Sequence, residues 1–369
     1  MRAILSSVKF KEMLNRVVKC AGFDSSSVIT GYLGIKTYQI GLKLCTTDDI
    51  NDFSVSTSNV EVDNEYMDIT VPLDKIVPLI SRITTESITL SVENDVLHIS
   101  ANGKYKMELA VDGQGNLLKM PVESPEILNV GFKEVSKADI IKIVDGAKQA
   151  LAKSYEYPIL TNYYVGERVI ASDGFIVARL DCNLLGGEYV VSPKLMSLLA
   201  LMDDNIKFYD LGNVLYFESN NCRIYHRYNA DAEQYPSKEF NDVCDEYNVG
   251  ESEHNKYGIK VRVKDMLEAL DRVMLFTALE NNPITLHFTD GYIGLASDND
   301  TGTEIVREYE HKIESRKTKF ECIVNGALLV NQLKAYPESI VDIRYGADNN
   351  IKLVCDDYIC IVAINDALK

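Results

Sequence analysis

With 369 residues, of which 46% are hydrophobic and 25% charged, the chain is too long for one ordinary core and too apolar to be disordered, so two or three globular domains are expected. Its net charge of −17 argues against a conventional basic nucleic-acid-binding domain. The chain has no apolar run near the roughly 20 residues of a membrane helix, and its first residues become charged before a signal-peptide core could form, which predicts a cytoplasmic protein that does not use a membrane.

The cysteines and histidines give no sign of a metal or cofactor. None of the eight cysteines forms a C-x-x-C pair, most sit inside apolar runs, and the five histidines are scattered. Reduced, buried thiols are therefore expected, and disulfides or a zinc site are not. The cysteines are Cys20, Cys45, Cys182, Cys222, Cys244, Cys322, Cys355 and Cys360.

Taken in chain order, the apolar pattern predicts six helices at intervals of about sixty residues. They begin near Lys9, Pro72, Ser136, Ser192, Val263 and Asn325. A short β-rich run precedes each helix, and these runs are Ala3–Val8, Met67–Val71, Leu128–Val135, Glu188–Val191, Gly258–Val263 and Glu321–Val324. Ser192 before Pro193 is a typical helix start, and Ser136 and Asn325 can cap in the same way. Pro78 is expected to kink or shorten its helix.

Further β-rich runs, separated by Asn, Asp and Gly, follow each helix. The most alike are 88–92, 96–101 and 105–111, then 206–209, 214–219 and 222–228, and finally 340–345, 351–355 and 358–364. Such runs are typical of antiparallel hairpins, so the repeating unit is predicted as β-α-β-β-β. Two units form one domain of an α+β fold with helices on one side of antiparallel sheets. The predicted domains are 1–122, 127–245 and 256–369, with linkers near Pro121–Pro125 and Asp242–Lys256.

Charge divides unevenly between helices and the rest of the chain. The six predicted helices cover 9–20, 72–83, 136–153, 192–202, 263–276 and 325–336. Within them Lys and Arg outnumber Asp and Glu by seven, which gives the helices a net charge of +7. Since the whole chain has a net charge of −17, the residues outside the helices have a net charge of −24. A ring with helices inside and sheets outside would hold duplex DNA within and repel it outside. Lysine is also simply a good helix former, and the fifth helix is net negative, so an ordinary solvated surface is the alternative.

The cations predicted to contact phosphates lie on or beside these helices. They are Lys9, Lys11, Arg16, Lys19, Lys75, Arg82, Lys142, Lys148, Lys153, Lys194 and Lys334.

Three stretches resemble the bacterial-type β sliding clamp, the β-subunit family of DNA polymerase III. The most specific is YPILTNYYVGERVIASDGFIVARLD (157–181), which has a Pro-x-Leu-Thr strand at 158–161 and Ser-Asp-Gly at 172–174. Residues 284–310 and 68–83 are similar to the family's corresponding segments. The resemblance implies three domains per chain and a head-to-tail homodimeric ring. It also implies double-stranded DNA, a DNA polymerase and a clamp loader ATPase as partners, with a tethering rather than an enzymatic role.

The resemblance also implies two protein-binding surfaces. At the subunit interface the matching positions are Met107 and Leu109 on one side and Leu275 and Phe276 on the other; Leu275 and Phe276 could equally belong to the core. A pocket for short peptides of partner proteins would lie between the second and third domains, although core packing is the alternative for Leu160 and Val177. The pocket positions are Leu160, Ser172, Gly174, Phe175, Val177, Pro236, Phe240, Ile361, Val362 and Ala363.

The sequence departs from the family at several of these places. Residues 361–366 read IVAIND where the family typically has a Met-Pro-Met-Arg-like strand, and Tyr157 stands where arginine is common. A basic residue common in the family is absent around Asp24. We therefore expect a divergent clamp, of cellular or phage origin, whose pocket prefers a different peptide.

Signatures of enzymes are lacking in the sequence. It contains no G-x-x-x-x-G-K-[ST] or G-x-G-x-x-G phosphate loop and no G-x-S-x-G elbow. The acidic pairs at 48–49, 203–204 and 356–357 fit turns better than catalysis, and 298–303 lacks most ligands of a calcium loop. The main alternative to a clamp is a protein-binding adaptor built on the same repeat, and a more distant one is a hydrolase with an unrecognised site.

Overall fold

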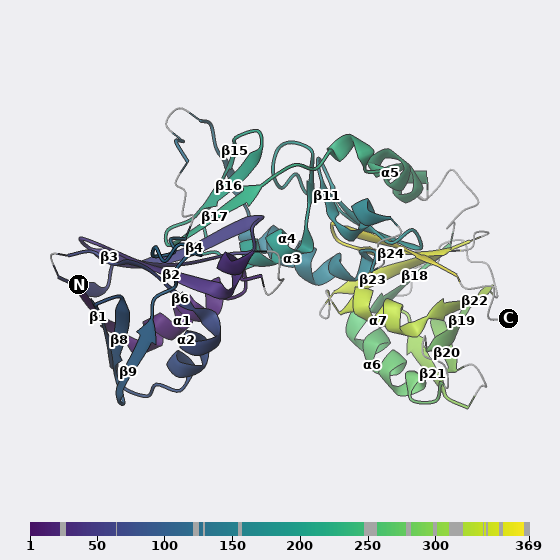
Figure 1. Cartoon of the computed structure of the whole chain (residues 1–369). Coiled ribbons are helices and arrows are strands. Elements are labelled where there is room, and N and C mark those ends of the chain that lie inside the picture. The colour runs from purple at the N-terminus through teal and green to yellow at the C-terminus, as the bar shows by residue number, and fades with distance from the viewer. Residues whose placement is uncertain are drawn as a thin grey trace. The chain divides into compact units, whose positions relative to one another are not determined.

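The β-α-β-β-β unit recurs six times in the computed structural model, with one additional strand and one additional helix among the described residues. The structure describes residues 1–22, 27–63, 65–120, 125–127, 130–153, 157–246, 257–277, 282–297, 301–309, 320–334, 336, 339–346 and 350–364. These form two compact units, Met1–Lys137 with Lys194–Asn229, and Ala138–Pro193 with Ala230–Lys369. Figure 1 shows the elements of both units, coloured from purple at the N-terminus to yellow at the C-terminus.

The helices of the repeat begin close to their predicted starts. They are α1 (Ser7–Val17), α2 (Leu73–Ser81), α3 (Lys137–Gly146), α4 (Pro193–Ala200), α6 (Val263–Met274) and α7 (Gly326–Leu333). Asn325 caps α7 through its side chain, which accepts from Leu328 N at 3.1 Å, and Pro193 is the first residue of α4, as its position predicts. Pro78 lies inside α2, which has nine residues.

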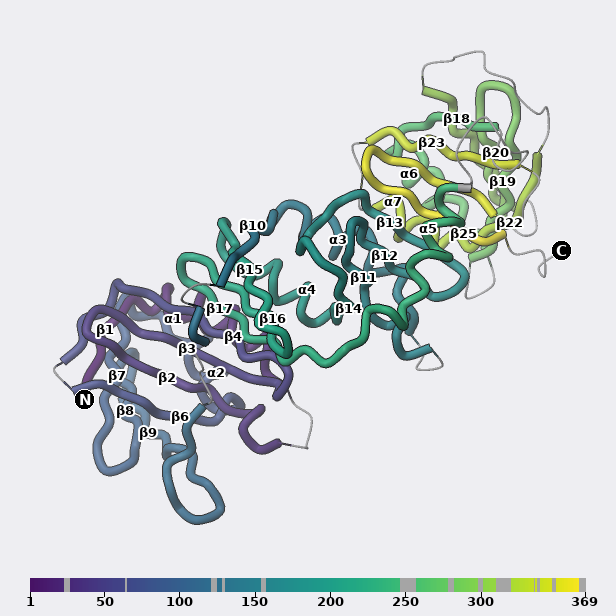
Figure 2. The backbone as a smooth tube through the Cα atoms, turned by 90° about the horizontal axis from the view of Figure 1, so that it is seen from above, coloured from purple at the N-terminus to yellow at the C-terminus, as the bar shows by residue number. Residues whose placement is uncertain are grey.

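In the first compact unit the strands form two antiparallel sheets (Figure 2). The five-stranded sheet has the order β5 (Val60–Val62), β1 (Arg2–Ser6), β7 (Ser87–Glu93), β8 (Val96–Ser100) and β9 (Lys104–Glu108). The first eight-stranded sheet has the order β10 (Lys133–Val135), β15 (Ile206–Asp210), β16 (Val214–Glu218), β17 (Cys222–Arg227), β4 (Asn51–Thr57), β3 (Gly41–Thr47), β2 (Tyr32–Tyr38) and β6 (Asp68–Pro72).

The second compact unit also has two antiparallel sheets. The second eight-stranded sheet has the order β14 (Tyr189–Val191), β11 (Tyr163–Val165), β12 (Val169–Ser172), β13 (Ile176–Leu180), β25 (Tyr358–Ala363), β24 (Asn350–Cys355), β23 (Ile340–Tyr345) and β18 (Tyr257–Arg262). The four-stranded sheet has the order β21 (Thr303–Arg307), β20 (Tyr292–Ser297), β19 (Pro283–Thr289) and β22 (Phe320–Asn325).

Consecutive repeat units exchange their first strands. β1 pairs with β7 of the next unit, and β6 of that unit pairs back with β2, with Ala3 opposite Leu90 and Ile69 opposite Ile35. The same reciprocal exchange joins β10 to β15 and β14 to β11, and then β18 to β23 and β22 to β19. Each repeat therefore completes the sheet of its neighbour, and the six repeats are associated in three pairs.

The cores lie where helices pack against these sheets. In α1 the buried side chains recur at helical spacing, and they are Phe10, Met13, Leu14 and Val17. This face packs on β3 and β4 of one sheet and on β1 and β7 of the other, with α2 beside it. In the second unit α6 and α7 pack against each other, and α6 also contacts strands of both sheets. Burial of the apolar faces of α1 and α6 against two sheets stabilises each compact unit.

Three predicted elements take a different form in the structure. The predicted strand at 158–161 is a 3-10 helix, η3 (Pro158–Thr161), because Pro158 fixes the first turn and Thr161 Oγ1 donates back to its carbonyl. The third helix ends at Gly146 and is followed by η2 (Lys148–Ala150), so it is shorter than predicted. The predicted linker from Asp242 is helical through Glu246 in α5 (Ser237–Glu246), while residues 247–256 lie outside the described part of the chain.

A buried histidine links the two repeats that meet in the first eight-stranded sheet. His226 on β17 is 6% exposed, and its Nδ1 lies 2.8 Å from Asn51 Oδ1 on β4. The Asn51 amide nitrogen donates to Asp48, so its oxygen faces the ring and Nδ1 must carry the proton. Burial lowers the pKa of His226 to about 4, so the ring stays neutral in the folded protein.

Lowering the pH should therefore destabilise the first compact unit through His226. The unfolded chain gains a proton near pH 6.5 and the folded one only near pH 4, so stability is complete above 6.5 and is lost as the pH falls through this window. Urea unfolding should show a loss of about 2 kcal/mol between pH 7.5 and 5 that His226→Gln lacks. Parallel pH profiles for the two proteins would show that His226 does not titrate in this way.

Candidate functional site

The predicted phosphate-contacting cations fall into two groups in the structure. Five are engaged with other protein groups: Lys9 with Glu12 at 3.1 Å, Lys142 with Asp357 at 2.9 Å, Lys11 with the carbonyl of Ile83, Arg82 with the carbonyl of Pro78 at 3.1 Å, and Arg16 with several groups. The others form no ion pair with any described residue. All of these are exposed except Lys194, which is half-buried, and they are Lys19, Lys75, Lys148, Lys153, Lys194 and Lys334.

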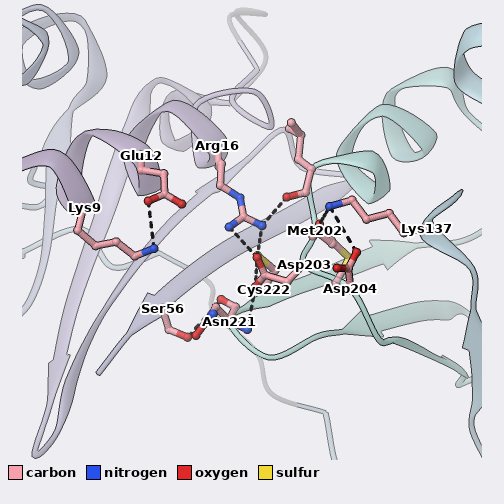
Figure 3. A network of polar contacts seen from close by, with 11 residues as sticks. Lys9, Glu12, Arg16, Ser56, Lys137, Met202, Asp203, Asp204, Asn221 and Cys222 are labelled. Carbon is pink, nitrogen blue, oxygen red and sulfur yellow. Dashed lines mark hydrogen bonds and ion pairs between the residues drawn. The ribbon is translucent and has the colours of Figure 1, made fainter. Parts of the chain in front are cut away.

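Arg16 is the most deeply engaged of these cations (Figure 3). Its guanidinium lies 3.0 Å from Asp203 Oδ1, and it donates to the carbonyl of Leu201 and to Cys222 Sγ at 2.7 Å. Burial alone would raise the pKa of Asp203, but Arg16 and the N–H of Asn221 lower it overall.

Only 17% of the Arg16 side chain is exposed. We therefore assign Arg16 to the junction between α1, the turn after α4 and β17, and not to an open phosphate-binding surface. Lys137 reinforces the same turn by donating to the carbonyl of Met202 at 2.7 Å (Figure 3).

The second compact unit contains an apolar surface pocket at the predicted peptide site. Its volume is about 480 Å³, and its lining residues are Tyr157, Pro158, Ile159, Leu160, Gln234 and Pro236. Of the predicted pocket residues, Leu160 and Pro236 line it directly. Leu160 also belongs to a buried cluster with Val177 and Ile361, against which Phe240 packs, so these four form one continuous apolar body.

A tight turn carries three further predicted residues. Ser172 Oγ donates to Ile176 O at 2.7 Å and accepts from Gly174 N at 3.0 Å. Asp173 Oδ1 accepts from Phe175 N and Ile176 N, both at 2.8 Å. Gly174 has φ +88°, which any side chain would strain. The turn leaves the Phe175 side chain 75% exposed.

The pairing of β13 with β25 decides which residues face the pocket. Val177 is opposite Ile361, and Ile176 is opposite Val362. Because side chains alternate between the faces of a strand, Val362 points to the other face, where it is 1% exposed. The prediction of Val362 as a pocket residue was therefore wrong. Ala363 is at the strand's end, where its N–H donates to Phe175 O at 3.2 Å.

Helix α5 covers the pocket side of β13 and β25, opposite α6 and α7 (Figure 1). Its last turn is held by basic groups of the sheet. Asp245 lies 2.9 Å from Arg168 and 2.7 Å from Arg179, and Lys352 donates to Cys244 O at 2.8 Å.

The electrostatics of this anchor match its geometry. Burial alone would raise the pKa of Asp245, but the two arginines lower it overall, and burial lowers the pKa of Lys352. Cations at a helix C-terminus are also favoured by the helix dipole. The anchor therefore fixes α5, and with it Phe240, beside the pocket.

The residues predicted for the subunit interface divide by burial. Met107 and Leu109 are each 7% exposed and pack within the first unit, whereas Leu275 and Phe276 are 81% and 55% exposed. β9 and β21 are terminal strands of their sheets, and Ile305 on β21 is 61% exposed. Sequence reasoning missed Ile305. Because successive side chains of a strand point to opposite faces, Ile305 and Val306 cannot both face the core, and one of them must be an outward apolar residue.

Acidic, thiol and imidazole side chains do not gather into a metal site in the described residues. Among them no cluster of three or more His, Cys, Asp and Glu side chains could hold a metal ion, and no helix is long and apolar enough to cross a membrane. All eight cysteines are free thiols. Asp49 and Asp356 have positive φ at turns, as the turn interpretation of their acidic pairs predicts.

The repeat, the strand exchange and the covering helices define the class of fold, an α+β DNA clamp. No family model and no curated protein sequence matches the chain, but solved structures match nearly all of it. The DNA polymerase sliding clamp of Bacillus subtilis has a TM-score of 0.79 at 15% identity, covering 99% of this chain and 98% of that one. For the DNA polymerase III β subunit of Thermotoga maritima the values are 0.77, 17%, 98% and 98%, and for the C. crescentus β sliding clamp 0.79, 14%, 99% and 99%. The chain thus has the β sliding clamp fold, which confirms the expected α+β architecture.

The geometry at Arg16 predicts that its contacts stabilise the fold. Arg16→Ala should lower the free energy of unfolding by about 2 kcal/mol, because it strands Asp203 and the Leu201 carbonyl. Lys9→Ala on the same helix removes an exposed pair and should cost less than about 0.5 kcal/mol. Chemical denaturation of both variants measures the difference, and equal losses would show that the Arg16 contacts add nothing beyond an exposed pair.

Proposed function

We propose that the protein is a DNA sliding clamp, a processivity factor that encircles duplex DNA and tethers a polymerase to it. The observation that carries the proposal is the clamp fold over 98–99% of the chain in each of the three comparisons. Its role is to hold and not to catalyse, and it works in the cytoplasm with a clamp loader ATPase that opens the ring.

The charge distribution supports DNA binding by the repeat helices. The exposed cations without a described ion pair come from several repeats, including Lys75 in α2, Lys148 in η2 and Lys334 after α7. Outside the predicted helices the chain is strongly acidic. Cations that contact only phosphates bind without sequence preference and weaken with salt, which suits a protein that slides.

We further propose that two chains close the ring head to tail. A heterologous contact needs two different surfaces on each chain. The terminal strands β9 and β21 offer free backbone groups for pairing, and Ile305, Leu275 and Phe276 offer exposed apolar surface near β21. Met107 and Leu109 are buried, so β9 would contribute mainly its backbone. The apolar pocket of the second unit would receive the partner peptides.

The adaptor alternative keeps the fold but drops DNA encirclement. It is favoured by the pairing of Arg16 and Lys142 with carboxylates, which removes two cations from the proposed lining. It predicts partner binding with no retention on DNA of any form.

Retention on circular DNA separates these functions. On nicked circular duplex the loaded protein should stay bound, and it should slide off after linearisation. Changing Lys75, Lys148 and Lys334 together to Glu should reduce retention at least tenfold. The retention that remains should depend less on salt concentration, because fewer phosphate contacts release counterions. A matched control changes Lys119, Lys238 and Lys260 to Glu, which alters the net charge equally outside the repeat helices. Equal retention of the triple variant and its control would exclude the proposed lining.

The proposed subunit contact predicts a change of mass. Leu275→Asp with Ile305→Asp should convert a dimer to a folded monomer, because both side chains are exposed and the charges would be buried only at the interface. Analytical ultracentrifugation measures the mass, and Ile40→Asp, at an exposed site in the first unit, is the control. A variant that stays dimeric would place the interface elsewhere.

A further inference from the structure

The floor of the peptide pocket is electrically neutral. None of its six lining residues is charged, and the apolar cluster beneath them contains Leu160, Val177 and Ile361. A peptide would therefore be held at its centre by apolar side chains. Charge selectivity, if the site has any, must come from the residues around the pocket.

Two exposed aromatic rings belong to the chain segments that build the pocket and the apolar cluster beneath it. Tyr157 lines the pocket and is 66% exposed. Phe175 is 75% exposed, and it sits two residues before Val177 at the tip of the Ser172–Ile176 turn. Exposed aromatic faces attract the ammonium or guanidinium of an incoming Lys or Arg.

A second segment that builds the pocket is acidic. Residues 231–245, which include the lining residues Gln234 and Pro236 and most of α5, contain five carboxylates and a single cation, Lys238. Of these carboxylates Asp245 is neutralised by Arg168 and Arg179.

The remaining carboxylates of the segment are turned to solvent. Glu233, Glu239 and Asp242 are exposed, and no hydrogen bond or ion pair of their side chains occurs among the described residues. Asp231 is also exposed and caps the short helix that precedes Tyr235. Asp173 adds a carboxylate beside Phe175, and Lys153 is an exposed cation that precedes Tyr157 in the chain.

We propose that this pocket takes a short peptide with an apolar centre flanked by Lys or Arg residues. The inference rests on the proposed role of the pocket in binding partner proteins. The apolar centre fills the space beside Leu160 and Pro236, while the basic flanks meet the carboxylates of residues 231–242 and the faces of Tyr157 and Phe175. A peptide with acidic flanks would meet charges of the same sign and bind more weakly.

The test compares synthetic peptides that share a central Leu-Phe pair and differ only in their flanks. Three peptides carry two Lys, two Ser or two Glu on each side, and fluorescence anisotropy measures their affinity for the full chain. We expect the Lys peptide to bind at least tenfold more tightly than the Glu peptide at low salt, with a difference that shrinks as salt rises.

Two triple variants test whether the selectivity comes from the exposed carboxylates of residues 231–242, which form the acidic rim of the pocket. Glu233→Gln, Glu239→Gln and Asp242→Asn together should reduce the Lys-over-Glu preference to about twofold. The matched control, Glu61→Gln, Glu86→Gln and Glu93→Gln, removes the same charge from exposed sites of the other compact unit and should keep the preference.

The outcomes separate this inference from the function on which it rests. Equal affinity for the Lys and Glu peptides, with binding abolished by Leu160→Asp, would overturn the inferred basic flanks and leave the pocket as a peptide site. Absence of binding by all three peptides, or binding that Leu160→Asp leaves unchanged in a folded protein, would overturn both. Equal loss of preference in the rim variant and its control would assign the effect to net charge and overturn the inference.

Discussion

The fold depends on the exchange of first strands between neighbouring repeats. A single β-α-β-β-β unit leaves one sheet edge open and one helix face only partly covered. When β1 crosses to β7 and β6 crosses back to β2, two units close each other's sheets with backbone hydrogen bonds. These backbone hydrogen bonds form only when both repeats of a pair are present, so neither repeat completes its sheet alone.

The strand exchange positions the helices, and their basic side chains fall into two groups. Arg16 and Lys142 reach carboxylates on neighbouring elements and hold the turn after α4 and the β24–β25 turn. Lys75, Lys148 and Lys334 stay exposed. Sequence composition cannot separate the two groups, because both consist of basic residues on helices of the same amphipathic pattern. Only the position of Asp203 or Asp357, which are distant in sequence, decides between them.

The sequence predicted the repeat well because its signals are local. Apolar spacing and turn residues located six helices and their hairpins, and Asn325 and Pro193 marked helix starts. The strand exchange could not be predicted from the sequence, since it pairs residues far apart in the chain. Helix α5 was missed because Phe240, Val243 and Cys244 give one short apolar face within an acidic segment. Val362 was misplaced because matching by resemblance ignores the alternation of strand faces.

Backbone pairing also continues across both predicted domain boundaries. β17 is hydrogen-bonded to β4, with Ile224 opposite Phe53, and β13 to β25, with Val177 opposite Ile361. The predicted domains are therefore joined by strand pairing as well as by the covalent connections near 121–125 and 242–256. A protease cut in either connection would leave both fragments bound through a shared sheet, and the nicked protein would run as one particle until denatured. Fragments expressed separately and split at these sites would have the same seam available for reassembly.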